Sequence, residues 1–230
     1  MNRGDGSRAI VFDLDGTLVD MRALYLRANQ LATKDVLGIE LSEDEVYELM
    51  ATGLPLRAAM RTLDENSADR LADVFVRHYR RERADLVQAF PGMTELLTTL
   101  RSQGHPIAVV TSKLRDEARA DLLATAMDGL IDVLVAFEDS TEHKPHPGPL
   151  IQALESLHAT RGVGIGDLPT DITATRAAGL SAIGVSWGYG TVEALLDAGA
   201  ESVCDSAHDL ELELDRLVSA ERARQRNLGI

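Results

Sequence analysis

Short hydrophobic runs rich in valine and isoleucine, separated by segments of helical periodicity, restrict this chain to a narrow class of folds. Most of the runs lack the alternation of a half-exposed strand, so we interpret them as buried parallel strands. They lie at residues 9–12, 106–110, 131–137, 162–165, 181–185 and 202–204. The helical segments lie at residues 94–103, 113–126, 149–158, 170–178 and 210–217. This alternation predicts an α/β fold, a Rossmann-like parallel sheet with helices on both faces.

The interval between the first two strands breaks the alternation, because about ninety residues without a strand pattern are far more than a crossover helix needs. Helical signals fill the interval. Ser42 with Glu45 three residues later forms a capping box before a periodic segment. The sequence therefore predicts a core domain made of residues 1–19 and 89–230, into which residues 20–88 are inserted as an all-helical domain.

The charge of the chain narrows the range of partners. Asp and Glu number 37 against 23 Lys and Arg, which gives a formal net charge of -14 at pH 7. Such a chain repels phosphate backbones and anionic lipid, so we expect neither nucleic acid nor a membrane as a partner.

Cys204 is the single cysteine, and no apolar stretch reaches the ~18–20 residues of a membrane span. Since the first residues also lack a signal-peptide pattern, we expect a cytoplasmic location.

Polar and charged side chains follow several predicted strands at the point where each strand ends. The ligand crevice of an open α/β sheet lies outside these carboxyl ends, so the residues that follow the strands are the candidates for a site. The first strand is followed by two aspartates, the second by two hydroxyl residues, the third by a lysine and the fourth by two more aspartates. These residues are Asp13, Asp15, Thr111, Ser112, Lys144, Asp167 and Asp171.

Each of these signals also has a local explanation. Asp13-Leu14-Asp15-Gly16 can form a turn that leaves a strand, and Thr111 and Ser112 can serve only as helix caps. A lone lysine such as Lys144 is usually a solvated surface charge. A calcium-binding loop that starts at Asp13 is excluded, because its sixth position is not glycine.

Taken together, the same residues indicate a phosphate site with a metal ion. Carboxylates gathered at one sheet edge raise one another's pKa values, so a cation is needed to neutralise them. Oxygen ligands favour a hard divalent ion, and Mg²⁺ is the ion we expect. A phosphate group then fits beside the ion, with Lys144 neutralising it and Thr111 donating a hydrogen bond. Asp13, close to the metal, is placed as a nucleophile.

At these residues the sequence resembles the haloacid dehalogenase superfamily of phosphatases, with four motifs in the family's order. They are Asp13-x-Asp15-Gly16-Thr17, Thr111 at the end of a hydrophobic strand, Lys144-Pro145, and Gly166-Asp167-x-x-x-Asp171. Phe90-Pro91-Gly92 and the stretch from Gly184 to Gly190 are similar to the phosphoglycolate phosphatase branch. The resemblance implies a core of the family's α/β type and identifies residues 20–88 as its helical cap domain.

The resemblance also implies a role for each motif residue. Asp13 would attack phosphorus to form an aspartyl-phosphate, and Asp15 would act as the general acid and base. Mg²⁺ would be bound by the Asp13 carboxylate, the backbone carbonyl of Asp15 and Asp167, with Asp171 in support. Phosphate would be bound by Thr111, Ser112 and Lys144.

A small phosphomonoester is the substrate class that the resemblance favours, and phosphoglycolate is its leading member. The alternatives are an inorganic pyrophosphatase, an enzyme similar to β-phosphoglucomutase, and a non-catalytic sensor of a phosphorylated ligand. The intact pair Asp13 and Asp15 argues against the sensor. Within the cap, Gly53 and Arg57 are the candidates for substrate specificity. Related phosphonatases carry a lysine soon after the glycine, which the residues after Gly53 lack, and related mutases carry an arginine near this point. Arg57 lies one residue too late for the mutase pattern, which disfavours a mutase.

Overall fold

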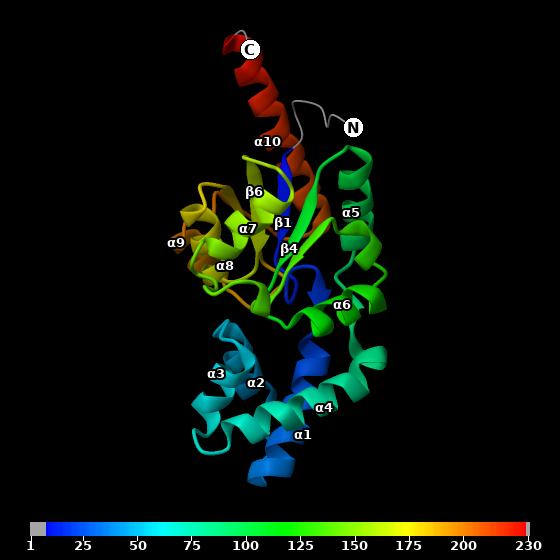
Figure 1. Ribbon diagram of the computed structural model, residues 1–230, viewed down its shortest axis with the longest axis vertical. Coiled ribbons are helices and arrows are strands. Elements are labelled where there is room, and N and C mark those ends of the chain that lie inside the picture. Colours follow the sequence, from blue (N-terminus) through cyan, green and yellow to red (C-terminus); the bar gives the residue numbers. More distant parts are fainter. Residues whose placement is uncertain (1–7, 229–230) are drawn as a thin grey trace.

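The computed structural model describes residues 8–228, and its centre is a sheet of six parallel strands (Figure 1). The strand order is β5-β4-β1-β6-β7-β8. The bounds are β1 (Ala9–Phe12), β4 (Ile107–Val110), β5 (Val133–Val135), β6 (Gly162–Gly166), β7 (Ser181–Val185) and β8 (Ser202–Cys204). All six predicted strands are present, and the predicted α/β class with a parallel sheet is confirmed.

Helices cover both faces of the sheet because alternate residues of each strand point to opposite faces. In β1, Ile10 and Phe12 belong to the hydrophobic cluster that contains Leu97 of α5. Val11 belongs to the second cluster, with Leu150 of α7. The helices of the core are α5 (Met93–Ser102), α6 (Arg115–Ala124), α7 (Gly148–Ser156), α8 (Pro169–Ala177), α9 (Val192–Asp197) and α10 (Ala207–Leu228).

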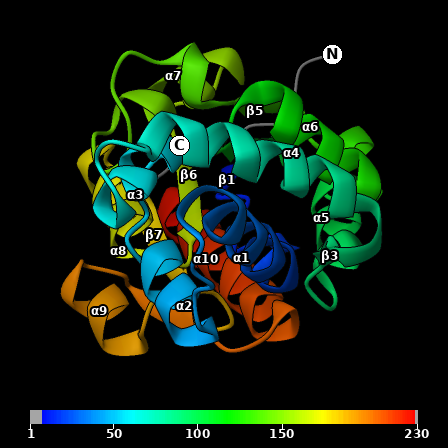
Figure 2. The same cartoon turned by 90° about the horizontal axis from the view of Figure 1, so that it is seen from below.

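Four helices form a separate helical unit below the carboxyl ends of the strands (Figures 1 and 2). They are α1 (Arg22–Leu37), α2 (Glu43–Ala51), α3 (Leu56–Leu63) and α4 (Ala68–Leu86). The capping box at the start of α2 is formed, since Glu45 N donates to Ser42 Oγ at 3.2 Å and Ser42 N donates to Glu45 Oε2 at 2.8 Å. Tyr25 and Phe75 pack between α1 and α4, with ring centroids 5.4 Å apart.

Two short strands, which the sequence pattern did not predict, stand where the chain passes between the two units. Strand β2 (Val19–Asp20) pairs antiparallel with β3 (Gln88–Ala89). The hydrophobic cluster that includes Ile10 and Phe12 continues through these residues into the helical unit. Among the described residues, no helix is long and apolar enough to cross a membrane.

Candidate active site

The sheet topology brings the predicted site residues to one edge. Strand β1 lies between β4 and β6, and the sheet is extended on one side of it by β4 and β5 and on the other by β6, β7 and β8. This reversal of strand order opens a crevice at the carboxyl ends of β1, β4 and β6. Asp13 directly follows β1, Thr111 follows β4, and Asp167 follows β6. Lys144 reaches the same place from the loop between β5 and α7.

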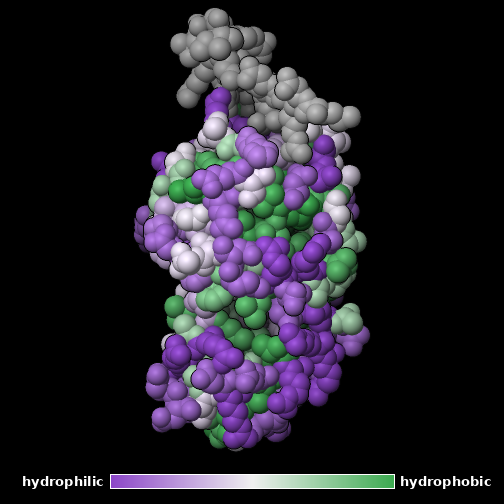
Figure 3. Space-filling model, viewed as in Figure 1, coloured by the Kyte–Doolittle hydropathy of each residue, from purple (hydrophilic) through white to green (hydrophobic). Residues whose placement is uncertain are grey.

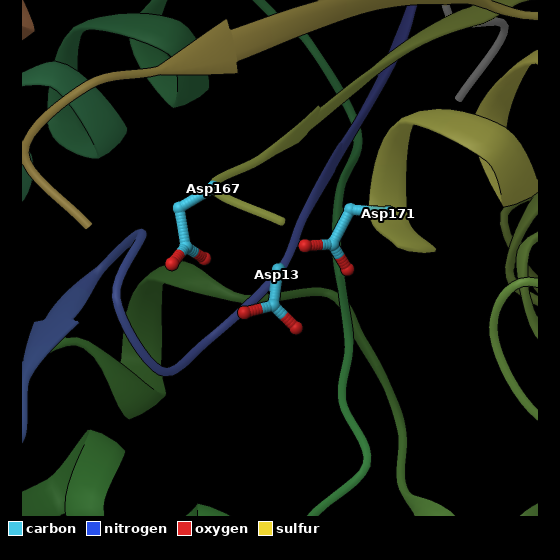
Figure 4. A group of neighbouring side chains, drawn as sticks. All are labelled: Asp13, Asp167 and Asp171. Atoms are coloured by element: carbon cyan, nitrogen blue, oxygen red, sulfur yellow. The ribbon is translucent and has the colours of Figure 1, made fainter. Parts of the chain in front are cut away.

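Three carboxylates meet in this crevice. One carboxylate oxygen each of Asp13, Asp167 and Asp171 lies within 4.8 Å of the other two, and Figure 4 shows the three groups facing one another. Asp167 is fully buried, and its two oxygens accept hydrogen bonds from Thr17 Oγ1 at 3.1 Å and from Tyr189 N at 2.9 Å. These bonds fix the orientation of the Asp167 carboxylate before any ligand arrives.

Lys144 is the cation of this cluster. Its Nζ lies 2.5 Å from Asp13 Oδ1 and 2.5 Å from Asp171 Oδ1, and it also donates to the backbone oxygen of Val110 at 3.1 Å. Its side chain is 8% exposed, so the alternative of a solvated surface charge is wrong. Asp171 also caps the start of α8, because its Oδ2 accepts a hydrogen bond from Leu168 N at 3.0 Å.

The electrostatics of the cluster favour an additional cation. Burial raises the pKa of Asp13 to about 7, although Lys144 opposes the shift. Burial, Asp13 and Asp171 raise the pKa of Asp167 well above its usual value. Burial lowers the pKa of Lys144, but the carboxylates of Asp13 and Asp171 outweigh it and raise that pKa. One ammonium does not neutralise three carboxylates, so a further cation is favoured here. The carboxylate oxygens are the kind of ligand that a hard metal cation prefers.

Asp15 belongs to a second buried charge network, which is built around Lys113. Lys113 Nζ lies 2.7 Å from Asp15 Oδ1, 2.6 Å from Asp121 Oδ2 and 2.8 Å from Tyr79 Oη. Tyr25 Oη donates to Asp15 Oδ2 at 3.2 Å. Lys113 was not among the site residues predicted from the sequence. Its position immediately after Thr111 and Ser112, at the end of a buried strand, is the signal that could have identified it.

The same network joins the helical unit to the core. Tyr79 on α4 donates to Asp121 on α6 at 2.6 Å. Arg83 on α4 forms ion pairs with Glu117 on α6 and, at 2.8 Å, with Asp121 Oδ1. Because Asp121 contacts both α4 and Lys113, the position of the helical unit and the surroundings of Asp15 are coupled.

The two predicted hydroxyl residues differ in their contacts. Thr111 is buried, and its Oγ1 accepts a hydrogen bond from Lys113 N at 3.2 Å. Ser112 is half-buried, and both residues line a cavity together with Asp13 and Lys144. Their predicted role as phosphate ligands stays a prediction.

The two specificity candidates of the helical unit also line this cavity. Gly53 has a φ of 63°, and a Cβ at this position would lie 3.1 Å from Leu168 Cδ1 of the core, so it sits at the contact between the units. Arg57 forms two ion pairs within the helical unit, with Asp69 at 2.6 Å and with Asp73 at 2.9 Å. The cavity has a volume of about 310 Å³ and both units contribute to its walls.

This chain is similar to known proteins of one family. Residues 10–185 match the family model described as haloacid dehalogenase-like hydrolase. The chain is 33% identical over 210 residues to the plasmid-encoded phosphoglycolate phosphatase of Cupriavidus necator, a match that covers 88% of this chain and 90% of that protein. It is 30% identical over 182 residues to the pyrophosphatase PpaX of Oceanobacillus iheyensis, which covers 78% of this chain and 84% of the relative.

A solved structure gives the same result at the level of the fold. The crystal structure of a predicted phosphoglycolate phosphatase from Haemophilus somnus superposes with a TM-score of 0.81 at 25% identity. The superposition covers 91% of this chain and 98% of the other. The likeness therefore extends over the sheet and the helical unit together.

Proposed function

Because this chain belongs to the haloacid dehalogenase-like hydrolase family, we propose that it is a Mg²⁺-dependent phosphatase that hydrolyses a small phosphomonoester through an aspartyl-phosphate on Asp13. One observation carries the proposal. Asp13 and Asp15 stand two residues apart, yet each is held by a different buried lysine, Lys144 and Lys113 respectively. Two carboxylates in different charged surroundings can take different roles in one reaction.

Asp13 is the proposed nucleophile. Its carboxylate attacks phosphorus as the bond from phosphorus to the leaving oxygen breaks, and the phosphoryl group is transferred to Asp13. Lys144, with Thr111 and Ser112, is proposed to bind the phosphoryl oxygens, which carry the charge that develops in the transition state. The buried position of Lys144 supports this role, because a charge in a dry site stabilises a nearby anion more than a solvated one does.

Asp15 is the proposed general acid and base. It donates a proton to the departing oxygen, and then accepts a proton from the water that attacks phosphorus and releases Asp13. Burial raises the pKa of Asp15, although Lys113 opposes the shift. The hydrogen bond from Tyr25 helps to hold the Asp15 carboxylate in place.

The proposed metal ligands are the carboxylates of Asp13 and Asp167 and the backbone carbonyl of Asp15, with Asp171 in support. Mg²⁺ bound there would neutralise negative charge on the phosphoryl oxygens. The helical unit, with the proposed bounds 20–88, would act as a cap that keeps bulk water away from the aspartyl-phosphate.

Phosphate release tests the proposal. A panel of phosphomonoesters, with phosphoglycolate and pyrophosphate included, is incubated with the protein in MgCl₂ and in chelator. We expect release that needs the metal and is lost in Asp13→Asn while the thermal unfolding profile is kept. Asp197→Asn, at an exposed position in α9, is the matched control and should retain full activity. Release that persists in Asp13→Asn would contradict the nucleophile assignment.

Pyrophosphatase activity is the second candidate, and the likeness to the pyrophosphatase PpaX of Oceanobacillus iheyensis favours it. The same panel distinguishes the two, since pyrophosphate would then be the fastest substrate. Conversion of glucose 1-phosphate to glucose 6-phosphate without phosphate release would instead indicate an enzyme similar to β-phosphoglucomutase. Tight binding of a phosphate ester without turnover would indicate a sensor.

A further inference from the structure

The cavity between the carboxylate cluster and the helical unit is mainly apolar on the side of the helical unit. Most of the side chains that this unit contributes are apolar. They include Met50, Leu54, Leu56, Met60, Phe75 and Val76. Figure 3 shows hydrophobic surface between the two units, whose outer surfaces are mixed. A leaving group bound in this cavity therefore contacts hydrocarbon.

The cations that line the cavity are already paired with carboxylates. Arg57 is the cation that the helical unit contributes to the cavity wall, and its Nη1 and Nη2 are bonded to Asp69 and Asp73. From the core, Lys113 holds Asp15 and Asp121, and Lys144 holds two carboxylates of the metal cluster. A second anion on a substrate would lose its water in this cavity. It would have to compete with Asp69 and Asp73 for Arg57, while Lys144 is assigned to the phosphoryl group and Lys113 is held by Asp15 and Asp121.

Asn29 is a polar residue in the otherwise apolar wall. The residue is 1% exposed and lines the cavity. Its Nδ2 donates to the backbone oxygen of Tyr25 at 2.9 Å, so the orientation of the amide is fixed. Its Oδ1 is buried without a hydrogen-bond partner. This oxygen can accept from a hydroxyl group, but it repels a carboxylate or a phosphate. Tyr189 lines the same cavity, and its hydroxyl is also buried without a hydrogen-bond partner. A hydroxyl can donate or accept, so it does not distinguish an anion from an alcohol.

We infer that the leaving group of the substrate is an uncharged, mainly apolar alcohol, without a second anionic group. This inference rests on the proposed phosphatase function and specifies its substrate class. It departs from phosphoglycolate, whose leaving group carries a carboxylate, and from pyrophosphate, whose leaving group is itself a phosphate. The cavity of about 310 Å³ is of the size that proteins use for whole small-molecule ligands, and it exceeds what a phosphoryl group alone requires.

A pair of matched substrates tests the inference. Isobutyl phosphate and phosphoglycolate have leaving groups of the same branching, but only the second has a charge. We expect kcat/KM for isobutyl phosphate to exceed that for phosphoglycolate by about tenfold or more, and benzyl phosphate, which fills more of the cavity, to be faster still. Faster turnover of phosphoglycolate or pyrophosphate would overturn the inference and leave the phosphatase function intact. No release from any ester would overturn both.

A charge placed on the apolar wall gives an independent test. Leu54 is 45% exposed at the cavity wall, so Leu54→Lys adds an ammonium there without burying it. We expect the preference for isobutyl phosphate over phosphoglycolate to fall by about fivefold, the upper range for an exposed ion pair. Ile39→Lys is the control, because Ile39 is 51% exposed in the same unit and is not among the cavity-lining residues. An unchanged preference in Leu54→Lys would count against the inference.

Discussion

The ammonium of Lys113 lies 2.7 Å from a carboxylate oxygen of Asp15, the proposed general acid and base. Both side chains are largely shielded from water, with 8% and 20% of their surfaces exposed. Burial lowers the pKa of Lys113, but Asp15 and its neighbours outweigh this and raise it above the usual value, so the ammonium stays charged. The pair thus holds Asp15 in one orientation near Asp13.

Replacing Lys113 by methionine should destabilise the protein strongly. The substitution would leave Asp15 and Asp121 buried without their shared cation, which costs about 3–5 kcal/mol of unfolding free energy. Chemical denaturation followed by circular dichroism measures this unfolding free energy. Lys34→Met is the control, because Lys34 is 65% exposed in a loose pair with Glu40, and its loss should change stability little. Equal stability of the two variants would contradict the structural role of Lys113.

Tyr79→Phe should weaken the contact between the helical unit and the core. The lost hydroxyl donates to Asp121 at 2.6 Å and accepts from Lys113 at 2.8 Å, so its removal takes one hydrogen bond from each of two buried charged groups, which stay paired with each other. We expect a loss of about 1–3 kcal/mol in unfolding free energy. Tyr47→Phe removes an exposed hydroxyl bonded to Glu43 and should have a much smaller effect. A cost for Tyr79→Phe no larger than for Tyr47→Phe would argue against this coupling.

Gly16→Ala should abolish most activity, whereas Gly38→Ala should not. Both glycines have a positive φ, 84° and 72°, so alanine is strained by a similar amount in each. A Cβ at Gly16 would lie 2.3 Å from Asp167 Oδ2, while one at Gly38 would meet nothing within 4 Å. Displacing Asp167 should lower kcat by about 100-fold. Phosphate release and thermal unfolding, measured on both variants, separate the clash from the backbone strain.

Mg²⁺ should stabilise the protein, and more so at about pH 8 than at about pH 5.5. Burial raises the pKa of Asp13 from 3.8 to about 7. Between these values the metal-free folded state binds more protons than the unfolded state, so its free energy of unfolding falls as the pH rises. The metal ion competes with the proton for Asp13 at low pH and relieves the repulsion at high pH. Melting temperatures in MgCl₂ and in chelator measure the effect, and an increment independent of pH would contradict it.

The strands and their sheet edge could be predicted because hydrophobic runs and helical periods are local features of the sequence. The rule that ligands bind at the carboxyl ends of parallel strands then placed Asp13, Thr111 and Asp167 together, as the structure does. The chemical roles of these residues and the bounds of the helical domain stay predictions.

Other features could not be predicted because they arise only in the folded chain. The network around Lys113 joins residues from α1, α4 and α6 that are far apart in the sequence. Strands β2 and β3 have two residues each, too few for a pattern to show. The apolar wall of the cavity depends on which faces of α2, α3 and α4 turn toward the core, and periodicity alone does not give that direction.

The pairing of Val19 with Ala89 and of Asp20 with Gln88 sets the two ends of the helical insertion side by side. An insertion with adjacent ends changes neither the length nor the register of the six strands of the sheet. Over evolutionary time such a segment can be lengthened, shortened or exchanged by a single event at one junction of the chain. Descendants of one ancestral gene can thus acquire new substrates while they inherit the same reacting groups unchanged.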